Sequence, residues 1–338
     1  MAVKPEVRDS YETIWERVGQ LADRPGNDED LFHHRLASIA AHRARSRGES
    51  LSGPLAEEEG YAAALALAAR PVLERVLDAV PGPVLVFKGP EVACRYPAAT
   101  MRPHHDLDLL VEDSAAAQAA LLAAGCELVW DRPSAHHELP VMFPDLPLIV
   151  ELHHAPKLPA FARPVHAAEL IAAAGPSRWD PRLLAPSPAE HAVLVAGHAW
   201  AERPLRRVLD LVDVELLLRD TTREEAGDVA RRWGMERMWS ATLAATDAIL
   251  GPAPAPWTLR TWARNLPAVR RRSRREELLE RALAPFAALP PGRAALAGAA
   301  ALAHGLNPRS GESITGRLRR GPYEHPALSS RAPSRAPD

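Results

Sequence analysis

RPHHDLDLLV, residues 102–111, alternates acidic and apolar side chains in its second half. Two aspartates, Asp106 and Asp108, stand two positions apart with leucines beside them. Side chains two residues apart on a β-strand point to the same face of a sheet, whereas a helical face repeats every three or four residues. We therefore expect a strand over residues 106–111 that carries two neighbouring carboxylates on one face and buries its leucines.

The two carboxylates need a positive partner, because like charges so close together repel each other. A divalent metal ion that carries nucleotide phosphates is a common reason for such a pair. LIVELH, residues 148–153, offers a third acid, Glu151, between apolar residues of another predicted strand. An acid in that setting is seldom a solvated surface group. The pattern predicts a metal site of Asp106, Asp108 and Glu151, with His153 on the same face as a neighbour of the ligands.

A lysine and a glycine end the apolar run VLVFKG, residues 84–89, which predicts a buried strand. Gly89 lets the backbone approach phosphates closely, and Lys88 offers a positive charge to them. Arg102, four residues before Asp106, is placed either to contact phosphate or to pair with the acids. A nucleotide is therefore the expected ligand of this region.

Composition narrows the class of protein. The chain has 338 residues, a formal net charge of -2 and two cysteines. The charge is typical neither of a protein that coats nucleic acid nor of an acidic tail protein. Two cysteines form no disulfide framework and no zinc-ligand cluster, which favours a reducing compartment. With no apolar signal core and no uncharged apolar stretch of about 18 residues, we expect a cytoplasmic protein with no membrane partner.

Four segments follow from the changing pattern along the chain. Residues 1–80 predict a helical N-terminal region, 81–155 a core with the strands, and 156–306 a helical C-terminal domain. Residues 307–338 are rich in Pro, Ser, Arg and Gly, which is typical of an extended or disordered tail.

Smaller signals place individual elements. Pro71 is expected to split or start a helix within residues 56–80, and Ser114 to cap a helix over 114–125. Further strands are expected at 127–130 and as a hairpin over 137–143 and 148–153. In the C-terminal half, helices are expected over residues 188–200, 204–219, 223–234, 236–250 and within 257–303.

The order and spacing of these motifs resemble the uncharacterised bacterial nucleotidyltransferase family of the polymerase β-type superfamily. The resemblance covers residues 80–155 and, more loosely, 186–250. It implies an α+β fold with a mixed sheet and flanking helices, two Mg²⁺ ions, and transfer of a nucleoside monophosphate from a nucleoside triphosphate such as ATP to a hydroxyl or similar acceptor. By resemblance Asp106 and Asp108 match the paired metal ligands, Glu151 the third acid, and Gly89 the glycine of the phosphate turn. The chain has Lys-Gly-Pro there, where the superfamily has Gly-Gly or Gly-Ser.

The second half adds a weaker likeness. The family has a His…Arg…Asp pattern on helices, which His198, Arg206, Arg207 and Asp210 resemble. Arg206 and Asp210 are four residues apart, so on a helix they would share one face and close the nucleotide site. Helix-packing hydrogen bonds and an intrahelical salt bridge are the competing explanation for these residues.

Other readings stay open at this stage. The strand acids can be solvated, and Glu151 can pair with His153 or an arginine. A catalytically silent nucleotide-binding or antitoxin-like module would carry the same motifs, although its acids need not be intact. The histidines near the predicted sheet suggest a transition-metal hydrolase, but no His-Glu-x-x-His spacing occurs. Five arginines within residues 270–275 predict a solvated face, with nucleic-acid contact weakly supported. The acceptor, whether a small molecule, a peptide or protein, or RNA, is left open.

Overall fold

The computed structural model describes residues 5–51, 53–130 and 134–306. Its helices up to the third strand of the chain are α1 (Pro5–Ala22), α2 (Asp28–His34), α3 (Ala37–Ser46), α4 (Gly53–Ala79), α5 (Pro90–Ala93) and α6 (Ser114–Ala123), with the 3-10 turn η1 (Ala99–Met101). The later helices are α7 (Ala167–Ala173), α8 (Pro188–Glu202), α9 (Val208–Leu217), α10 (Arg223–Arg232), α11 (Glu236–Leu250), α12 (Trp257–Trp262), α13 (Arg274–Ala288) and α14 (Pro291–Leu306), with the 3-10 turn η2 (Leu218–Asp220). None of these helices combines the length and apolar character that a membrane crossing requires.

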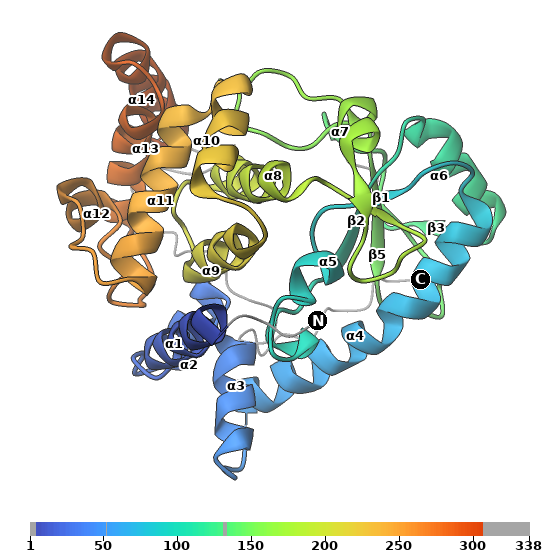
Figure 1. Ribbon diagram of the computed structural model, residues 1–338, viewed down its shortest axis with the longest axis horizontal. Coiled ribbons are helices and arrows are strands. Elements are labelled where there is room, and N and C mark those ends of the chain that lie inside the picture. Colours follow the sequence, from blue (N-terminus) through green and yellow to red (C-terminus); the bar gives the residue numbers. More distant parts are fainter. Residues whose placement is uncertain (1–4, 52, 131–133, 307–338) are drawn as a thin grey trace. The chain divides into compact units, whose positions relative to one another are not determined.

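The strands of the described residues form one mixed sheet (Figure 1). They are β1 (Leu85–Val86), β2 (Asp106–Leu110), β3 (Glu127–Leu128), β4 (Val141–Met142), β5 (Ile149–His153), β6 (Gly175–Pro176) and β7 (Leu184–Ala185). Their order is β3-β4-β5-β2-β1-β7-β6. β2 runs parallel to β5 and antiparallel to β1, and β1 runs parallel to β7. The predicted α+β class with a mixed sheet and flanking helices is confirmed.

The two faces of the sheet differ in chemistry. Leu107 and Leu109 of β2 and Val150 and Leu152 of β5 belong to one apolar core with residues of α4 and α6. Figure 1 shows α4 and α6 on this side of the sheet. Because side chains alternate along a strand, Asp106, Asp108, Glu151 and His153 project from the opposite face. The alternation predicted from the sequence thus separates an apolar core from a polar face.

Helix α8 covers the polar face. His191 Nε2 of α8 donates to the Phe87 carbonyl oxygen at 2.7 Å, at the end of β1. His198 lies two helical turns further on, so it projects from the same side of α8. Its Nε2 lies 3.1 Å from the Lys88 Nζ. The first helix after the sheet therefore brings two histidines to the polar face.

The described chain divides into two compact units that interleave along the sequence. The sheet and the polar face belong to the unit made of Glu59–Arg203 and Asp210–Thr242. The other unit takes the described residues before Glu59, the segment Pro204–Leu209, and the described residues from Leu243 on. The boundaries predicted at 80, 155 and 306 stay predictions, and the predicted tail over 307–338 lies outside the described residues.

Several local predictions need correction. Pro71 lies inside the single helix α4 and neither splits nor starts it. The N-cap of α6 is Asp113, whose Oδ1 accepts from the Ala116 amide at 2.9 Å, whereas Ser114 is the first helical residue. Helix α9 begins at Val208 rather than at residue 204. The predicted hairpin is confirmed, because β4 pairs antiparallel with β5.

Candidate functional site

Two acids of neighbouring parallel strands stand at the centre of the site. The β2–β5 register sets Asp108 opposite Glu151, so both carboxylates leave the same face of the sheet side by side. Asp108 is 1% exposed. Burial of a carboxylate is costly unless it has partners, so the strand geometry alone calls for a cation or hydrogen-bond donors here.

Histidines from the same strand pair complete the group. His153 Nε2 lies 3.1 Å from Asp108 Oδ1 and 3.5 Å from Glu151 Oε2. Among the described residues, Asp108, Glu151 and His153 each offer one ligand atom, and these atoms lie within 4.8 Å of one another. An isolated antiparallel bridge sets His137 opposite His153, and His137 Nε2 lies 3.7 Å from Glu151 Oε2. Carboxylate oxygen and imidazole nitrogen are both metal ligands.

Lys88 supplies the positive charge beside Asp108. Its Nζ lies 3.0 Å from the Asp108 carboxylate and donates a hydrogen bond to His198 Nε2 at 3.1 Å. An ammonium group can only donate, so the His198 Nε2 accepts and its proton sits on Nδ1. Burial, reinforced by the charge of Lys88, holds the pKa of His198 well below its ordinary value. The imidazole next to the lysine is thus neutral.

The charges shift the ionisation of the central groups. Burial raises the pKa of Asp108, but the Lys88 ammonium and the hydrogen bond from His153 outweigh it, so the net pKa is lowered. Burial lowers the pKa of His153, and its hydrogen bonds with Asp108 and Glu151 outweigh that effect and raise it. Asp108 is therefore a carboxylate at neutral pH, as a metal ligand must be.

Asp106 shares the polar face but not the close group. It is the first residue of β2, half-buried, and its register partner on β5 is Ile149 rather than an acid. Positions two residues apart on a strand are about 6.6 Å apart, which is wider than the cluster around Asp108. The metal role of Asp106 stays a prediction.

The turn after β1 is fixed from two sides. Gly89 has a φ of 54° and a ψ of -122°, a conformation that residues with a Cβ avoid. Arg102 Nη1 donates to the Gly89 carbonyl oxygen at 3.3 Å, while His191 holds the Phe87 carbonyl. The predicted phosphate turn is thus anchored by its backbone oxygens, and Lys88 lies between the two anchors.

Arg102 has a different role from those expected. Its Nε and Nη2 donate to the two oxygens of Asp213 on α9 at 2.8 Å each. Burial lowers the pKa of Arg102, but the charge of Asp213 more than offsets this and raises it. Tyr96 donates to the same carboxylate at 2.6 Å. With all three guanidinium nitrogens engaged within the protein, Arg102 holds the Gly89 turn, and the prediction that it pairs with the strand acids is wrong.

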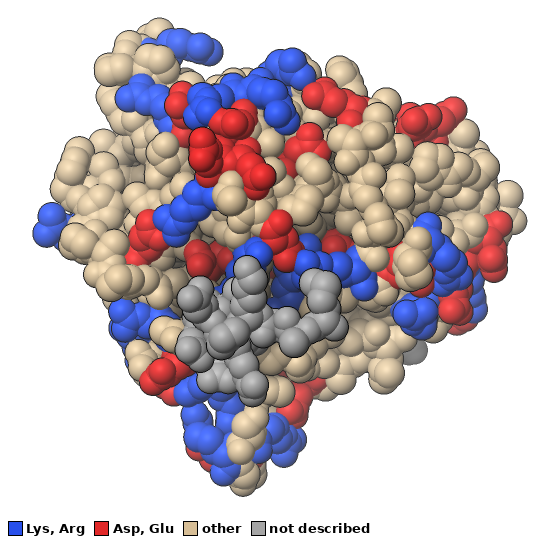
Figure 2. Space-filling view, viewed as in Figure 1, with Lys and Arg blue, Asp and Glu red and all other residues tan. Residues whose placement is uncertain are grey.

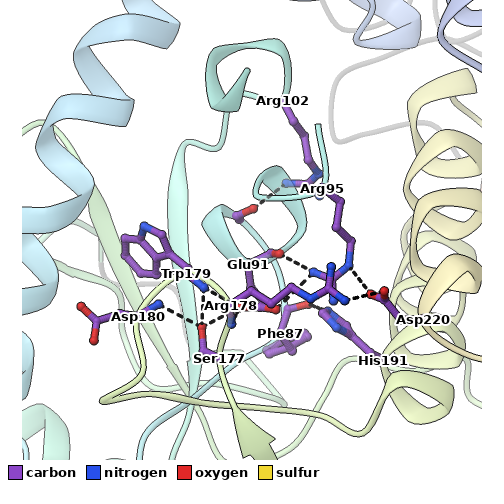
Figure 3. Close-up of polar contacts among 11 residues, drawn as sticks. Phe87, Glu91, Arg95, Arg102, Ser177, Arg178, Trp179, Asp180, His191 and Asp220 are labelled. Carbon is purple, nitrogen blue, oxygen red and sulfur yellow. Dashed lines mark hydrogen bonds and ion pairs between the residues drawn. The ribbon is translucent and has the colours of Figure 1, made fainter. Parts of the chain in front are cut away.

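A buried carboxylate braces the same turn from below. Glu91 Oε2 accepts from Ser177 Oγ at 2.5 Å and from the Arg178 amide at 3.0 Å, and Glu91 Oε1 accepts from Arg95 Nη1 at 3.1 Å. Figure 3 shows Glu91 between Arg95 and the turn that contains Ser177. Arg95 in turn pairs with Asp220 at 2.9 Å. Helix α5, directly after Gly89, is therefore held by charge-assisted hydrogen bonds.

The two other predicted nucleotide contacts lie further along the chain. Asp210 is in the first turn of α9, but Arg206 precedes that helix and belongs to the other compact unit. The helix face that Arg206 and Asp210 were expected to share is therefore absent. Their contacts with a nucleotide stay predictions.

The arginine run also differs from expectation. Arg272 is 2% exposed, donates to Glu280 Oε2 at 2.7 Å, and is part of the core of its unit rather than of a solvated face. Arg270 and Arg274 pair with Glu276 and Glu277 at 2.5 Å. On the face shown in Figure 2, acidic and basic side chains lie among each other. Because acids already neutralise much of the run, it offers little support for a nucleic-acid contact.

Sequence reasoning missed part of the site. His153 was expected beside the ligands, whereas its nitrogen is in the close group itself, and His137 was not singled out as a neighbour of Glu151. The spacing of Glu151 and His153 on one strand was the available signal. His191 and Asp213 had none, because their partners are backbone or residues more than 100 positions away.

Comparison with protein families gives one match. The family described as "Uncharacterised nucleotidyltransferase" matches residues 31–251, which is more than half of the chain. The matched range contains the sheet, helix α8 and every residue of the group around Asp108. No curated protein and no solved structure matches the chain. The chain belongs to this uncharacterised nucleotidyltransferase family.

Proposed function

We propose that the protein transfers a nucleoside monophosphate from a nucleoside triphosphate to an acceptor hydroxyl, with pyrophosphate as the leaving group. The observation that carries the proposal is the pair Asp108 and Glu151, opposite each other on β2 and β5 beside the Lys88–Gly89 turn. Family membership supports the same class of reaction. Phosphoryl chemistry of this kind depends on positioning and charge neutralisation more than on a protein nucleophile.

The residues present fit a divalent metal ion. Asp108 and Glu151 offer carboxylate oxygens, and Asp108 Oδ2 is buried with no hydrogen-bond partner among the described residues. A buried polar atom without a hydrogen-bond partner is a common sign of an unmodelled ligand. A metal bound here would neutralise phosphate charge and activate the acceptor hydroxyl. Two Mg²⁺ ions were expected from the resemblance, and Asp106 on the same face is proposed as the ligand that widens the site toward a second ion.

The chain's own residues have distinct proposed roles. Lys88 meets the phosphate charge, since its flexible stem already places an ammonium at the acids. Gly89 lets the backbone approach the phosphates, because a side chain at its φ of 54° would be strained. Glu151 is 16% exposed, so it is open to serve as a ligand or as general base on the acceptor. Arg102 and His191 position the turn without touching the nucleotide.

A second candidate function also has an observation in its favour. Lys88 Nζ lies 3.0 Å from the Asp108 carboxylate, where it already neutralises the charge that a metal would otherwise balance. A chain in which this ion pair persists would bind a nucleotide without turnover, as a regulatory or antitoxin-like module. The intact acid pair on β2 and β5 favours the transferase.

The experiment incubates the full chain with each nucleoside triphosphate, MgCl₂ or MnCl₂, and cell extract. Mass spectrometry then searches for species heavier by one nucleoside monophosphate. The transferase predicts such a species with the wild type and none with the Asp106→Ala/Asp108→Ala variant. A product that persists in the variant would show that these acids are not the site. Metal-dependent nucleotide binding without any product would instead support the silent module.

A further inference from the structure

Imidazole nitrogens stand where an all-oxygen magnesium site would have carboxylates or water. His153 Nε2 lies 3.1 Å from Asp108 Oδ1 and 3.5 Å from Glu151 Oε2. His137 Nε2 lies 3.7 Å from Glu151 Oε2, and the two imidazole rings are 5.0 Å apart. The nitrogens therefore face the same carboxylates that would bind the metal.

A purely structural role explains only part of this arrangement. One histidine donor suffices to hydrogen-bond Asp108 Oδ1, yet the antiparallel bridge between residues 137 and 153 brings a second ring to Glu151. His153 is 2% exposed and has Phe87 packed edge-on at 5.7 Å, which fixes the ring with Nε2 toward the acids. Asp108 Oδ2, in the same group and buried, has no hydrogen-bond partner among the described residues. The second ring and this oxygen both point to a missing cation.

We propose that His153 is a direct ligand of the metal with Asp108 and Glu151, that His137 supports it at Glu151, and that the site prefers a transition-metal ion such as Mn²⁺, Co²⁺ or Zn²⁺ to Mg²⁺. The proposal rests on the proposed function only in using the same site. Mg²⁺ favours oxygen ligands in a strict octahedron, whereas imidazole suits the first-row transition metals. Selectivity for nitrogen-binding ions follows from the ligand set rather than from the size of the site.

The test uses MnCl₂ alone with the intact full-length protein. Pulsed electron paramagnetic resonance of the bound Mn²⁺ detects nitrogen nuclei in its first shell, and growth on ¹⁵N-histidine identifies them as imidazole. We expect a nitrogen coupling that changes with the isotope. Titration calorimetry should show at least about tenfold tighter binding of Mn²⁺ than of Mg²⁺, since losing even an indirect partner of a ligand typically costs 10–100-fold in affinity.

Variants separate the ligand from its neighbours. His153→Gln should remove the nitrogen coupling and weaken Mn²⁺ binding at least about tenfold. His154→Gln is the matched control, because His154 is exposed and follows on the alternate side of the chain. It should leave both readouts unchanged. The coupling in the wild type needs no variant, so the test holds even if His153→Gln does not fold.

Two results would overturn the proposal. One is bound Mn²⁺ with no nitrogen coupling, and the other is equal affinity for Mn²⁺ and Mg²⁺ that His153→Gln does not change. Neither result touches nucleotidyl transfer, which an oxygen-only site can support. Conversely, a histidine-bound Mn²⁺ in a protein with no affinity for nucleotides would contradict the proposed function and keep this inference.

Discussion

Lys88 and Asp108 form a nearly buried ion pair whose two members depend on each other. The Lys88 side chain is 16% exposed and that of Asp108 is 1% exposed. Such a pair gains little over apolar residues of the same size, but removal of one partner strands the other charge away from water. The site therefore holds a carboxylate that needs a cation, and either the lysine or a metal ion can supply it.

Replacement of Lys88 tests this exchange of cations. Lys88→Met keeps most of the aliphatic stem and should lower the free energy of unfolding by about 3 kcal/mol, because Asp108 loses its counter-charge. MnCl₂ should restore more stability to the variant than it adds to the wild type. Urea unfolding with and without the metal measures both effects.

Lys157→Met is the matched control. Lys157 pairs with Glu202 on the surface, where its side chain is 37% exposed, and exposed pairs contribute little. Its unfolding should change by less than about 1 kcal/mol. If Lys88→Met proved no more damaging than this control, the dependence of Asp108 on Lys88 would be wrong.

His191 makes stability depend on pH. Burial lowers its pKa to about 3, so the folded protein keeps it neutral while the unfolded chain binds a proton near pH 6.5. Between these values the unfolded state holds more protons, so the contribution is complete above about pH 6.5 and falls as pH falls. His191→Gln keeps an N–H donor for the Phe87 carbonyl and does not titrate.

We expect the stability of the wild type to fall by up to about 1.4 kcal/mol per pH unit more than that of His191→Gln between pH 6.5 and pH 5. Urea titrations at several pH values give the two curves. Parallel curves would mean that His191 is not held neutral by the fold.

Single residues were predictable where chemistry and local pattern coincide. Asp108, Glu151 and Lys88 carry their meaning in strand alternation and in their place at strand ends, and the structure brings them together. Arg102 failed as a phosphate contact because its partner, Asp213, lies 111 residues away on another helix. A guanidinium next to acids in sequence cannot reveal which carboxylate it meets in space.

At the scale of elements, the short turn between β1 and α5 carries the strictest backbone demand. A Cβ on Gly89 would lie 3.4 Å from the Asp106 carbonyl oxygen and 3.5 Å from the His104 ring, in addition to the strain of its φ of 54°. Gly82, before β1, also has a positive φ, 84°, but a Cβ there would meet nothing within 4 Å. The two glycines separate backbone strain from close packing.

Gly89→Ala should destabilise the protein by about 1–3 kcal/mol and weaken nucleotide binding, because the turn must shift away from β2. Gly82→Ala should cost about 1 kcal/mol and leave binding intact. Thermal unfolding and nucleotide titration measure the two properties. Equal effects of both variants on nucleotide affinity would argue that the turn does not approach the phosphates.

Elements were predictable to the extent that local signals decide them. β2, β5 and α8 follow from alternation and helical periodicity. α4 continues through Pro71, since its apolar residues pack on the sheet and tertiary burial overrides a proline penalty. β6 and β7 were missed, because two-residue strands leave no periodic pattern and exist through pairing with β1.

At the scale of the whole molecule, the chain builds one compact unit from two stretches of sequence. The α+β class follows from the local patterns, but the interleaving of Glu59–Arg203 with Asp210–Thr242 does not. Contacts such as Arg102 with Asp213 decide it, and no composition shift marks them. Linear segment boundaries therefore describe texture better than they describe compact units.

Ligand binding should protect the unit that contains the site. A nucleoside triphosphate with MnCl₂ at 100 times its Kd stabilises the folded form by about 2.7 kcal/mol. Hydrogen exchange should therefore slow most in β2, β5 and α8, and less in α13 and α14, which belong to the other unit. Mass-spectrometric exchange of the full chain measures this. Protection confined to α13 and α14 would place the nucleotide elsewhere.

The most direct measurement of the central claim is metal-dependent nucleotide binding by the wild type and by Asp108→Asn. The variant keeps the shape of the side chain and removes the charge that a metal needs. Titration calorimetry with each nucleoside triphosphate, in MnCl₂, in MgCl₂ and in EDTA, should give binding that requires metal and is at least about tenfold weaker in the variant. Nucleotide binding that is equally tight in EDTA, or unchanged in Asp108→Asn, would contradict the account.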